Sequence, residues 1–484
     1  MKNQKKLFLT YFVMICALIL TTISTAQAAT FTVNVDTDQK DLVPGDGMCA
    51  AAYRTCTLRA AVEEANAFPG DDVIVFSDSF KAPNAPKTIY LTLGQLHLQS
   101  AIEIKGPGAR QLMIDGNHTT RVFFTGASQK NMSISKLTIQ NGYSKVDPFL
   151  SFAAGVWHAK GHLRLEEVTV RDNYTMNEDP LLGEAGGGIY NGGGMQIISS
   201  TVSGNKGGYG GGIYNNGTLV VWNSTISGNA TQQKGGAILN LDYAYIANST
   251  IVNNTAQVEG GGIWNHNASE LFFYNTIIAN NNAPLNDDVN GTVNSHGNNL
   301  VENRGNSVGY LASDLPNGTN PILGSLQNNG GQTDTHALLP GSPAINAGNN
   351  CPYNNATVCL EFGGTDQRGQ GYPRKISTVD IGSFEFQGRN TGFVKISGKV
   401  LKPNGRGLNK AVVTLTGSDG RPRSVETDQH GNFSFDEVTP NEAYVIAAES
   451  RQYNYASQNL FVAEARNDVN FVPVETRESM DAPR

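Results

Sequence analysis

The stretch Gly186-Gly187-Gly188-Ile189-Tyr190-Asn191 decides the architecture, because the chain repeats it three more times at an almost constant interval. The later copies occupy residues 210–215, 235–240 and 260–265, and the central isoleucines lie 24, 25 and 25 residues apart. A second phrase, Ser200-Thr201-Val202-Ser203-Gly204-Asn205, returns with nearly the same step at 224–229, 249–254 and 275–280. Two phrases that share one period indicate a solenoid.

The composition of the repeat selects the kind of solenoid. Each repeat holds short β-branched runs broken by Gly and Asn, without a 3.6-residue periodicity long enough for a helix. Leucine-rich repeats need a leucine scaffold and propeller blades need about 40–45 residues, so neither fits. Coils of about 24 residues, stacked about 4.8 Å apart, satisfy their backbone groups on the coils above and below. We therefore predict an all-β chain with a right-handed parallel β-helix at residues 85–300, including weaker copies at 137–141 and 155–173.

Two columns of asparagine recur at the coil interval. We expect the first to form an inward ladder in which side-chain amides bond from coil to coil. Its expected members are Asn205, Asn229, Asn254 and Asn280. The second column consists of Asn191, Asn215, Asn240 and Asn265.

Residues 1–28 have the three parts of a cleaved export signal. A basic start precedes an apolar run from Leu7 to Leu20, and Ala26-Gln27-Ala28 gives a small-x-small cleavage site. An uncleaved anchor is the alternative, but the run is shorter than the roughly 20 residues that a membrane-spanning helix needs. We expect a mature chain that begins at Ala29 and is secreted or held at the cell surface.

The cysteines and the net charge agree with an extracellular protein. Beyond Cys16 in the leader, four cysteines form two close pairs, which predicts local bridges Cys49–Cys56 and Cys351–Cys359 in an oxidising compartment. Neither pair has zinc-site spacing. The formal net charge of −7 argues against nucleic acid as a partner, because phosphate neutralisation needs clustered Lys and Arg. An acidic polysaccharide would be repelled overall as well, although a local basic groove could still exist.

Residues 29–84 form the expected amino-terminal cap. Leu58, Ala61, Val62 and Ala65 recur at helical spacing and predict a short helix at 57–68 that closes the open end of the stack. The segment from Cys49 to Asn66, with Cys56-Thr57-Leu58-Arg59-Ala60-Ala61-Val62 inside it, resembles the CSLREA domain of secreted bacterial β-helix proteins. Ala60 stands where that family has Glu, so the resemblance implies a helical cap and no charged role at this position.

Residues 301–388 contain long segments that resemble the choice-of-anchor Q region, and the repeats are similar to those of polymorphic outer-membrane proteins with a pectin-lyase-like fold. The segments run from Asn328 to Gly348, from Asp366 to Gly369 and from Asp380 to Phe386. The resemblance implies a carboxy-terminal part of the β-helix and display at a surface. After Phe386 we find neither an LPxTG-like signal nor a terminal apolar helix, which leaves the anchoring route open.

The composition changes again near Gly388. Residues 389–476 replace the Asn and Gly columns with alternating strands, and 477–484 form a tail. Ile396–Val400, Ala411–Leu415 and Thr427–Phe435 resemble the carboxypeptidase regulatory-like domain, which implies a β-sandwich that stabilises or docks and is not itself a peptidase.

Parallel β-helices also carry polysaccharide lyases and hydrolases, whose active sites need a base beside carboxylates or a carboxylate pair. The catalytic candidates are Glu166, Arg171 and Asp172 on one coil, with Glu167 beside them and Asp179 and Glu184 in the following insertion. Neighbouring coils carry Ser or Asn at the matching sites, so a solvated strand face is the alternative. No hydrolase, metalloprotease or phosphate-loop motif occurs.

A row of aromatic residues follows the inward apolar position of successive coils. It comprises Trp157, Tyr190, Tyr214 and Trp264, interrupted by Leu239. Strand alternation turns the row outward, where exposed rings would stack on sugars. The alternative is an aromatic ladder covered by loops.

The sequence therefore predicts a secreted or cell-surface β-helix protein that is non-enzymatic and serves adhesion, matrix contact or glycan binding. The alternatives are an extracellular polysaccharide lyase or hydrolase and a structural envelope component. We expect no cofactor and no metal site. The histidines His158, His162, His266, His296 and His336 lack metal spacing, and Asp36, Asp38, Asp41 and Asp46 form either a calcium site or a solvated loop. The expected partner is an extracellular polysaccharide or surface glycan, and the oligomeric state stays open.

Overall fold

The computed structural model describes residues 28–83, 85–126, 130–145, 153–176, 186–350, 364–375, 378–387, 394–417, 422–438, 442–462 and 466–476. The chain divides into two compact units, Met1–Phe386 and Gln387–Arg484. The leader before Ala28, the cysteines Cys351 and Cys359 and the acidic pair Asp179 and Glu184 lie outside the described residues.

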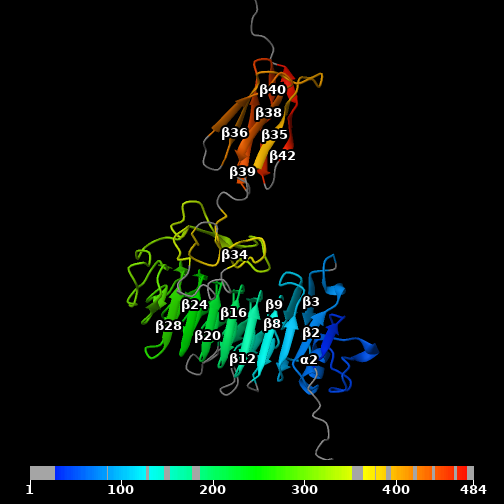
Figure 1. The fold of residues 1–484 in the computed structure, drawn as a ribbon, viewed down its shortest axis with the longest axis vertical. Coiled ribbons are helices and arrows are strands. Elements are labelled where there is room, and N and C mark those ends of the chain that lie inside the picture. The colour runs from blue at the N-terminus through cyan, green and yellow to red at the C-terminus, as the bar shows by residue number, and fades with distance from the viewer. Residues whose placement is uncertain are drawn as a thin grey trace, which may run out of the picture. The chain divides into compact units, whose positions relative to one another are not determined.

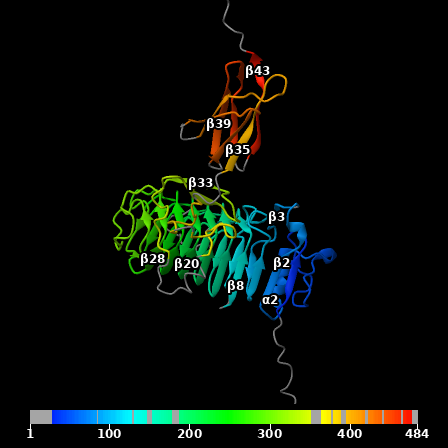
Figure 2. The same ribbon diagram turned by 45° about the horizontal axis from the view of Figure 1, so that its top comes forward.

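The first unit is a parallel β-helix, which confirms the predicted fold class (Figures 1 and 2). Its described coils build four parallel sheets. In spatial order, sheet 1 contains β1 (Thr30–Val33), β2 (Asp72–Phe76), β5 (Ile102–Lys105), β8 (Asn131–Ser135), β12 (His162–Glu166), β16 (Gly194–Ile198), β20 (Thr218–Trp222), β24 (Tyr243–Ala247), β28 (Glu270–Tyr274) and β31 (Asn294–Ser295). Sheet 2 contains β3 (Lys87–Tyr90), β6 (Leu112–Asp115), β9 (Thr138–Gln140), β13 (Thr169–Arg171), β17 (Thr201–Ser203), β21 (Thr225–Ser227), β25 (Thr250–Val252), β29 (Ile277–Ala279) and β32 (Leu300–Val301).

The other two sheets complete the coil. Sheet 3 contains β4 (Leu96–Leu98), β7 (Phe123–Thr125), β11 (Val156–His158), β15 (Ile189–Asn191), β19 (Ile213–Asn215), β23 (Ile238–Asn240), β27 (Ile263–Asn265) and β30 (Val289–Asn290). Sheet 4 contains the short strands β10 (Tyr143–Lys145), β14 (Tyr174–Met176), β18 (Lys206–Gly207), β22 (Ala230–Thr231) and β26 (Thr255–Ala256). Alternate side chains of the longer strands point inward, and one continuous apolar core fills the coils.

The first asparagine column is a buried ladder, but one predicted member is wrong. Asn173, Asn205, Asn229, Asn254 and Asn281 bond in series through amides at 2.9 Å, and the last donates to Asp288. The ladder member is Asn281 and not Asn280, because β25 pairs with β29 so that Thr250 faces Ile277. In that coil the repeated sequence phrase is therefore offset by one residue from the structural register. Asn280 instead has a φ of 54° and an exposed side chain, and it occupies the turn position that Gly204 and Gly228 hold in earlier coils.

The second asparagine column also forms a ladder. Asn191, Asn215 and Asn240 each donate from Nδ2 to the Oδ1 of the next asparagine at 2.7 Å, ending on Asn265. In the preceding coil His158 holds the same register position. It is fully buried and bonded to Thr125 at 2.8 Å, and burial lowers its pKa.

The amino-terminal end of the stack is closed as predicted. Helix α2 (Leu58–Ala67) buries Leu58, Ala61, Val62 and Ala65, and the Thr57 side chain caps it by accepting from the Ala60 N–H at 3.0 Å. Cys49 and Cys56 form the expected disulfide. Short 3-10 turns at Ala52–Arg54 and Asp78–Phe80 complete this region.

Residues 302–318 continue along the stack, since Val308 forms a parallel bridge with Thr292 and the Leu315 and Gly318 N–H groups donate to the Asn299 and Glu302 carbonyls. The described residues that follow contain an antiparallel pair, β33 (Leu323–Gln327) and β34 (Thr335–Leu338), and segments that lie over the outer face of sheet 2. Hydroxyl groups on β21 and β25 of sheet 2 contact them: Thr225 bonds to Gln367, Ser227 to His336 and Thr250 to Ser383. Polar side chains on the outer face of sheet 2 are thus buried by the carboxy-terminal segments of the same unit.

The second unit contains two sheets around one core. The first has the order β38 (Asn432–Val438), β35 (Val394–Val400) and β42 (Arg466–Phe471). The second has the order β37 (Pro422–Glu426), β36 (Val412–Thr416), β39 (Glu442–Glu449), β40 (Tyr453–Tyr455) and β43 (Pro473–Thr476), with β41 (Gln458–Val462) also paired to β39. Ile396 and Phe433 of the first sheet share a core with Val413 and Ile446 of the second, which makes this unit a β-sandwich.

Candidate functional site

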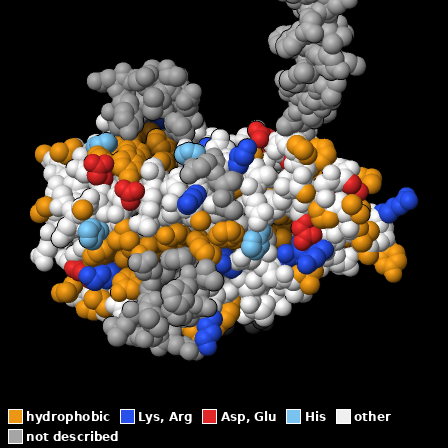
Figure 3. All heavy atoms as spheres, turned by 90° about the horizontal axis from the view of Figure 1, so that it is seen from below, with side chains coloured by type: hydrophobic (Ala, Val, Ile, Leu, Met, Phe, Trp, Pro, Cys, Tyr) orange, Lys and Arg blue, Asp and Glu red, His pale blue; other side chains and the backbone are white. Residues whose placement is uncertain are grey.

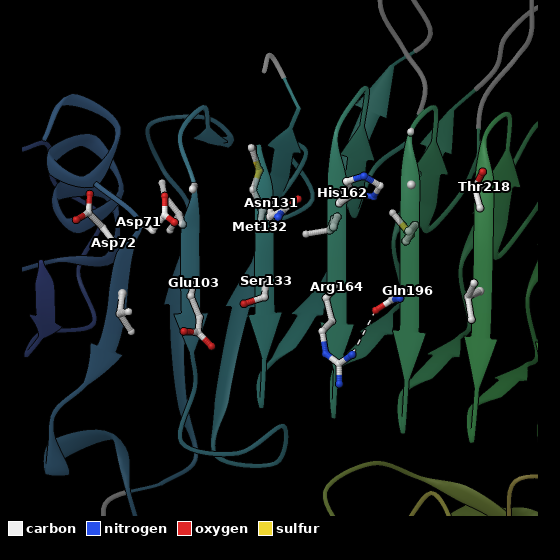
Figure 4. A pocket seen from close by; sticks show the side chains of 18 residues that line it. Asp71, Asp72, Glu103, Asn131, Met132, Ser133, His162, Arg164, Gln196 and Thr218 are labelled. Atoms are coloured by element: carbon white, nitrogen blue, oxygen red, sulfur yellow. Dashed lines mark hydrogen bonds between the residues drawn. The ribbon is translucent and has the colours of Figure 1, made fainter. Parts of the chain in front are cut away.

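A groove lies on the outer face of sheet 1. It has a volume of about 790 Å³ and crosses the six strands from β2 to β20. Figure 4 shows its polar side chains side by side on successive strands: Asp71, Asp72, Glu103, Asn131, Ser133, His162, Arg164, Gln196 and Thr218. Since parallel strands are about 4.8 Å apart, the groove offers a regular series of contacts along the stack.

The register of sheet 1 explains why these side chains align. Glu103 faces Ser133, Ser133 faces Arg164, Arg164 faces Gln196, and the column continues through Val220, Tyr245 and Phe272. The residues on either side of each member point into the core, as the alternating burial of β8 and β12 shows. A single outward column therefore begins with charged and polar groups and ends with apolar and aromatic ones.

The polar half of the groove has a net negative lining. Arg164 is its clearest cation, and it binds Glu166 at 2.9 Å and Gln196 at 3.2 Å. Glu103 pairs with Lys105 at 2.8 Å. Asp72 is 1% exposed, and burial raises its pKa. With the accessible carboxylates of Asp71 and Glu103 against Arg164, the lining suits neutral or cationic groups better than carboxylates.

The carboxy-terminal half of the same face is aromatic, and the sequence prediction missed it. Tyr245 and Tyr274 form a cluster with Ala247, and Val220, Trp222, Tyr243 and Phe272 pack against it. The rings of Tyr243 and Phe272 lie 5.5 Å apart, and His296 lies 5.4 Å from Phe272. Trp222, Tyr243 and Phe272 are half-buried, so parts of their rings stay accessible.

Aromatic rings also gather on sheet 3, at the row that the sequence predicted. The row does face away from the core, but the exposure expected of its centre is corrected: Tyr190 and Tyr214 are 9% and 3% exposed. Their rings stack 5.3 Å apart, and Ala153, Tyr209 and Leu241 pack around them. The ends of the row are half-buried, with Arg121 over Trp157 at 4.7 Å and Lys234 over Trp264 at 4.6 Å. The covered alternative thus describes the middle of this row.

The surface of the β-helix is accordingly far from uniformly polar. Figure 3 shows one face on which hydrophobic side chains form a band along the stack of coils, with lysine, arginine and histidine side chains beside it.

The three charged candidates do not converge on one point. Glu166 ends β12 on sheet 1, whereas Arg171 ends β13 on sheet 2, beyond the corner at Glu167. Glu166 is bound to Arg164, and Arg171 donates to Gln140 at 2.8 Å. Asp172 occupies a turn position with a φ of 55°. Arg171 and Asp172 do lie together, as an ion pair at 3.9 Å, but Glu166 is not part of it and none of the three lines the groove.

The remaining polar candidates are engaged in structure. Asp36 pairs with Lys87 at 2.9 Å, Asp38 with Arg59 at 2.6 Å, and Asp41 and Asp46 accept backbone N–H groups. His336 is buried, and burial lowers its pKa. His162 lines the groove, and His266 lies 5.9 Å from Trp264. Within the described residues no three His, Cys, Asp or Glu side chains are grouped to hold a metal ion.

The second unit has a clear relative among domain families. Residues 395–473 match the carboxypeptidase regulatory-like domain. This match runs from the second residue of β35 to the first residue of β43, and the resemblance seen in the sequence is thereby supported. No curated protein matches the chain.

Among solved structures, eight chains match, and one of them is described as pectate lyase Pel9A. The similarity covers 75% of this chain and 98% of that one, at 12% sequence identity and a TM-score of 0.37. The β-helix assignment rests on the strand pairings of the four sheets. In the described part of the chain, no helix is both long and apolar enough to cross a membrane.

Proposed function

We propose that this chain is an exported protein that binds an extended, neutral or amine-bearing polysaccharide along the outer face of sheet 1 and does not cleave it. The observation that carries the proposal is one outward column of side chains that runs from the polar groove to the aromatic cluster. The strand repeat of about 4.8 Å is comparable to the length of one sugar residue in an extended chain, so successive coils would contact successive sugars.

The charge of the groove supports the class of polymer. Two accessible carboxylates, Asp71 and Glu103, share the groove with one arginine that is already bound to a glutamate, and the whole chain carries a net charge of −7. A polyuronate would meet repulsion, whereas hydroxyl groups and ammonium groups would find acceptors at Glu103 and Asp71. Aromatic faces such as Tyr243 and Phe272 would stack on the apolar faces of the sugar rings.

Export is part of the same proposal. The sequence of the leader, with its small-x-small site before Ala29, supports secretion, and the Cys49–Cys56 disulfide is compatible with an oxidising compartment. We further propose that the β-sandwich serves as a stabilising or docking module.

The test is a binding and cleavage assay of the chain from Ala29 to Arg484 on matched neutral, amine-bearing and uronate polymers. Retention on neutral or amine-bearing polymers is expected, with no shortening and no new ultraviolet absorbance from unsaturated sugars. The double variant Tyr243→Ala with Phe272→Ala is expected to weaken binding at least tenfold, whereas Trp157→Ala with Trp264→Ala on sheet 3 leaves it within about twofold. A tenfold loss corresponds to about 1.4 kcal/mol, within reach of two stacking contacts.

The controls separate the possible failures. Circular dichroism of each variant would exclude unfolding as the cause of lost binding. Equal losses for the two double variants would contradict the choice of sheet 1, preference for polyuronate would contradict the charge argument, and shortening of any polymer would overturn the non-enzymatic proposal.

A further inference from the structure

The carboxylate of Asp72 lies in an unusual position at the start of β2. It is 1% exposed, and its Oδ1 accepts a hydrogen bond from the Ala29 backbone N–H at 2.8 Å. Its Oδ2 is buried and has no hydrogen-bond partner among the described residues. A buried, half-satisfied carboxylate is costly, and its location must be explained.

The donor of that single hydrogen bond is the nitrogen at which export cleavage is expected. Ala29 follows the small-x-small sequence, and its carbonyl is already fixed in sheet 1 by the Val73 N–H at 2.8 Å. The pairing of β1 with β2 therefore holds the Ala29 nitrogen against Asp72 irrespective of what precedes it. Figure 4 shows Asp71 and Asp72 at the same end of the groove, with their carboxylates turned in different directions.

We propose that removal of residues 1–28 places a new α-ammonium group at Ala29 on the Asp72 carboxylate, and that this buried ion pair secures β1 only in the processed protein. The inference rests on the export proposed above. In the cleavage step an export protease hydrolyses the Ala28–Ala29 peptide bond: water gives its oxygen to the Ala28 carboxylate, and the Ala29 nitrogen becomes an amine that takes up a proton from solvent.

The chemistry of the two groups agrees with this pairing. An amide nitrogen offers one N–H, whereas an ammonium offers three and a positive charge, so the second oxygen of Asp72 gains a donor. In the unprocessed chain burial raises the pKa of Asp72, the Ala29 N–H lowers it and the neighbouring Asp71 raises it. The ammonium stabilises the ionised form of the Asp72 carboxylate, which burial disfavours.

The charged groups on the elements packed against β1 and β2 are largely engaged elsewhere. On α2, Arg59 binds Asp38, and Glu63 and Glu64 accept backbone N–H groups of the loop at 41–47. On β5, Glu103 and Lys105 bind each other. Asp71 is exposed and adjacent to Asp72 in sequence, so it attracts the Ala29 ammonium more weakly than Asp72 does.

The pairing has a definite pH signature. A free α-amine has a pKa of about 7.7–8.0, and an ion pair with Asp72 raises it in the folded chain. The stability that the pair contributes is therefore present from the pH at which Asp72 ionises up to about pH 7.7, and it is lost as the pH rises through the raised pKa of the amine. Raising the pKa of the amine by about 1 corresponds to a tenfold change in the folding equilibrium.

The experiment uses the chain from Ala29 to Arg484 with a free amino terminus, and the same chain acetylated at Ala29. The pKa of the α-amine is measured by pH-dependent labelling with an amine-selective reagent, followed by mass spectrometry of the terminal peptide. We expect the pKa to lie at least about 1 above the free value in the parent chain and in the control Asp71→Asn, and at the free value in Asp72→Asn. We also expect amide exchange in β1 to be at least tenfold slower in the free form than in the acetylated form below pH 7.

Each outcome decides the matter. Equal amine pKa values in the parent and Asp72→Asn, or equal exchange in the free and acetylated parents, would overturn the ion pair, and the second comparison needs no substitution. A different first residue in the naturally exported protein would refute the export step itself. Polysaccharide binding is measured separately, so the proposed glycan function can fail without affecting either arm.

Discussion

The offset in the asparagine ladder provides a sharp test, because two adjacent asparagines are assigned opposite roles. Asn281 is 7% exposed; its Oδ1 accepts from both the backbone N–H and the side chain of Asn254, at 2.9 Å each. Its Nδ2 donates to the Ile251 carbonyl at 3.0 Å and to Asp288 at 2.9 Å. Asn280 has an exposed side chain and a φ of 54°. We therefore expect Asn281→Ala to destabilise the β-helix strongly and Asn280→Gly to be nearly neutral.

The size of the effect follows from the bonds that are lost. Asn281→Ala leaves the Asn254 backbone N–H without its acceptor and the Ile251 carbonyl without its side-chain donor, both in the interior. At about 1–3 kcal/mol for each of the two buried groups left unsatisfied, the expected loss is about 2–6 kcal/mol. Asn280→Gly keeps a residue that tolerates positive φ, and its cost should stay below about 1 kcal/mol. Asn280→Ala should cost about 1–2 kcal/mol, because an alanine is strained in the left-handed region.

The assay is urea unfolding followed by circular dichroism, with hydrogen exchange of residues 249–301 to locate the change. Faster exchange is expected on the coils above and below Asn281. Equal losses for Asn281→Ala and Asn280→Ala, or a larger loss for Asn280→Gly, would refute the ladder assignment.

Three further perturbations follow from the same contacts. Replacing Cys49 and Cys56 together with Ser should cost about 2–3 kcal/mol by releasing a short loop, and exchange at 57–68 should quicken, whereas unchanged exchange there would contradict a role in the cap. Thr57→Ala removes both the cap of α2 and the bond from the buried Thr57 hydroxyl to the Gln39 carbonyl, so it should cost about 2 kcal/mol, measured by the same unfolding assay against Thr55→Ala, whose exposed hydroxyl donates to the Ala52 carbonyl. Burial raises the pKa of Asp288 to about 7 from 3.8, so the unfolded chain releases this proton first and stability should fall as the pH rises from about 4 to about 7. In Asp288→Asn that slope should shrink in urea midpoints measured across this range, and an unchanged slope would exclude Asp288 as its source.

Much of the fold was predictable because every coil of the solenoid requires the same residue types at the same positions. An inward isoleucine, a buried amide and a turn residue recur with one period, and the interior accepts few alternatives at each place. The cap was predictable for the same reason, since Leu58 and Val62 must cover an open core. The offset at Asn280 was not predictable from the sequence. Asparagine occupies both 280 and 281, so the expected residue type already occurs one position before the ladder position, and only the strand pairing shows which of the two side chains points inward.

The candidate site was much harder to predict, because an outward face is not held to the repeat. Trp222, Tyr243 and Phe272 lie in different columns of sheet 1, so they form no row in the sequence, and only the pairing of β20, β24 and β28 brings them together. The row at Trp157 and Trp264 shows the opposite error. It keeps perfect register and yet its centre is covered, which register alone does not reveal. On a β-helix the period of a side chain predicts its place in the fold, whereas its availability to a ligand depends on loops and return segments that do not repeat. Departure from the period, as in the polar-to-aromatic change along sheet 1, is therefore the better indication of a surface shaped for function.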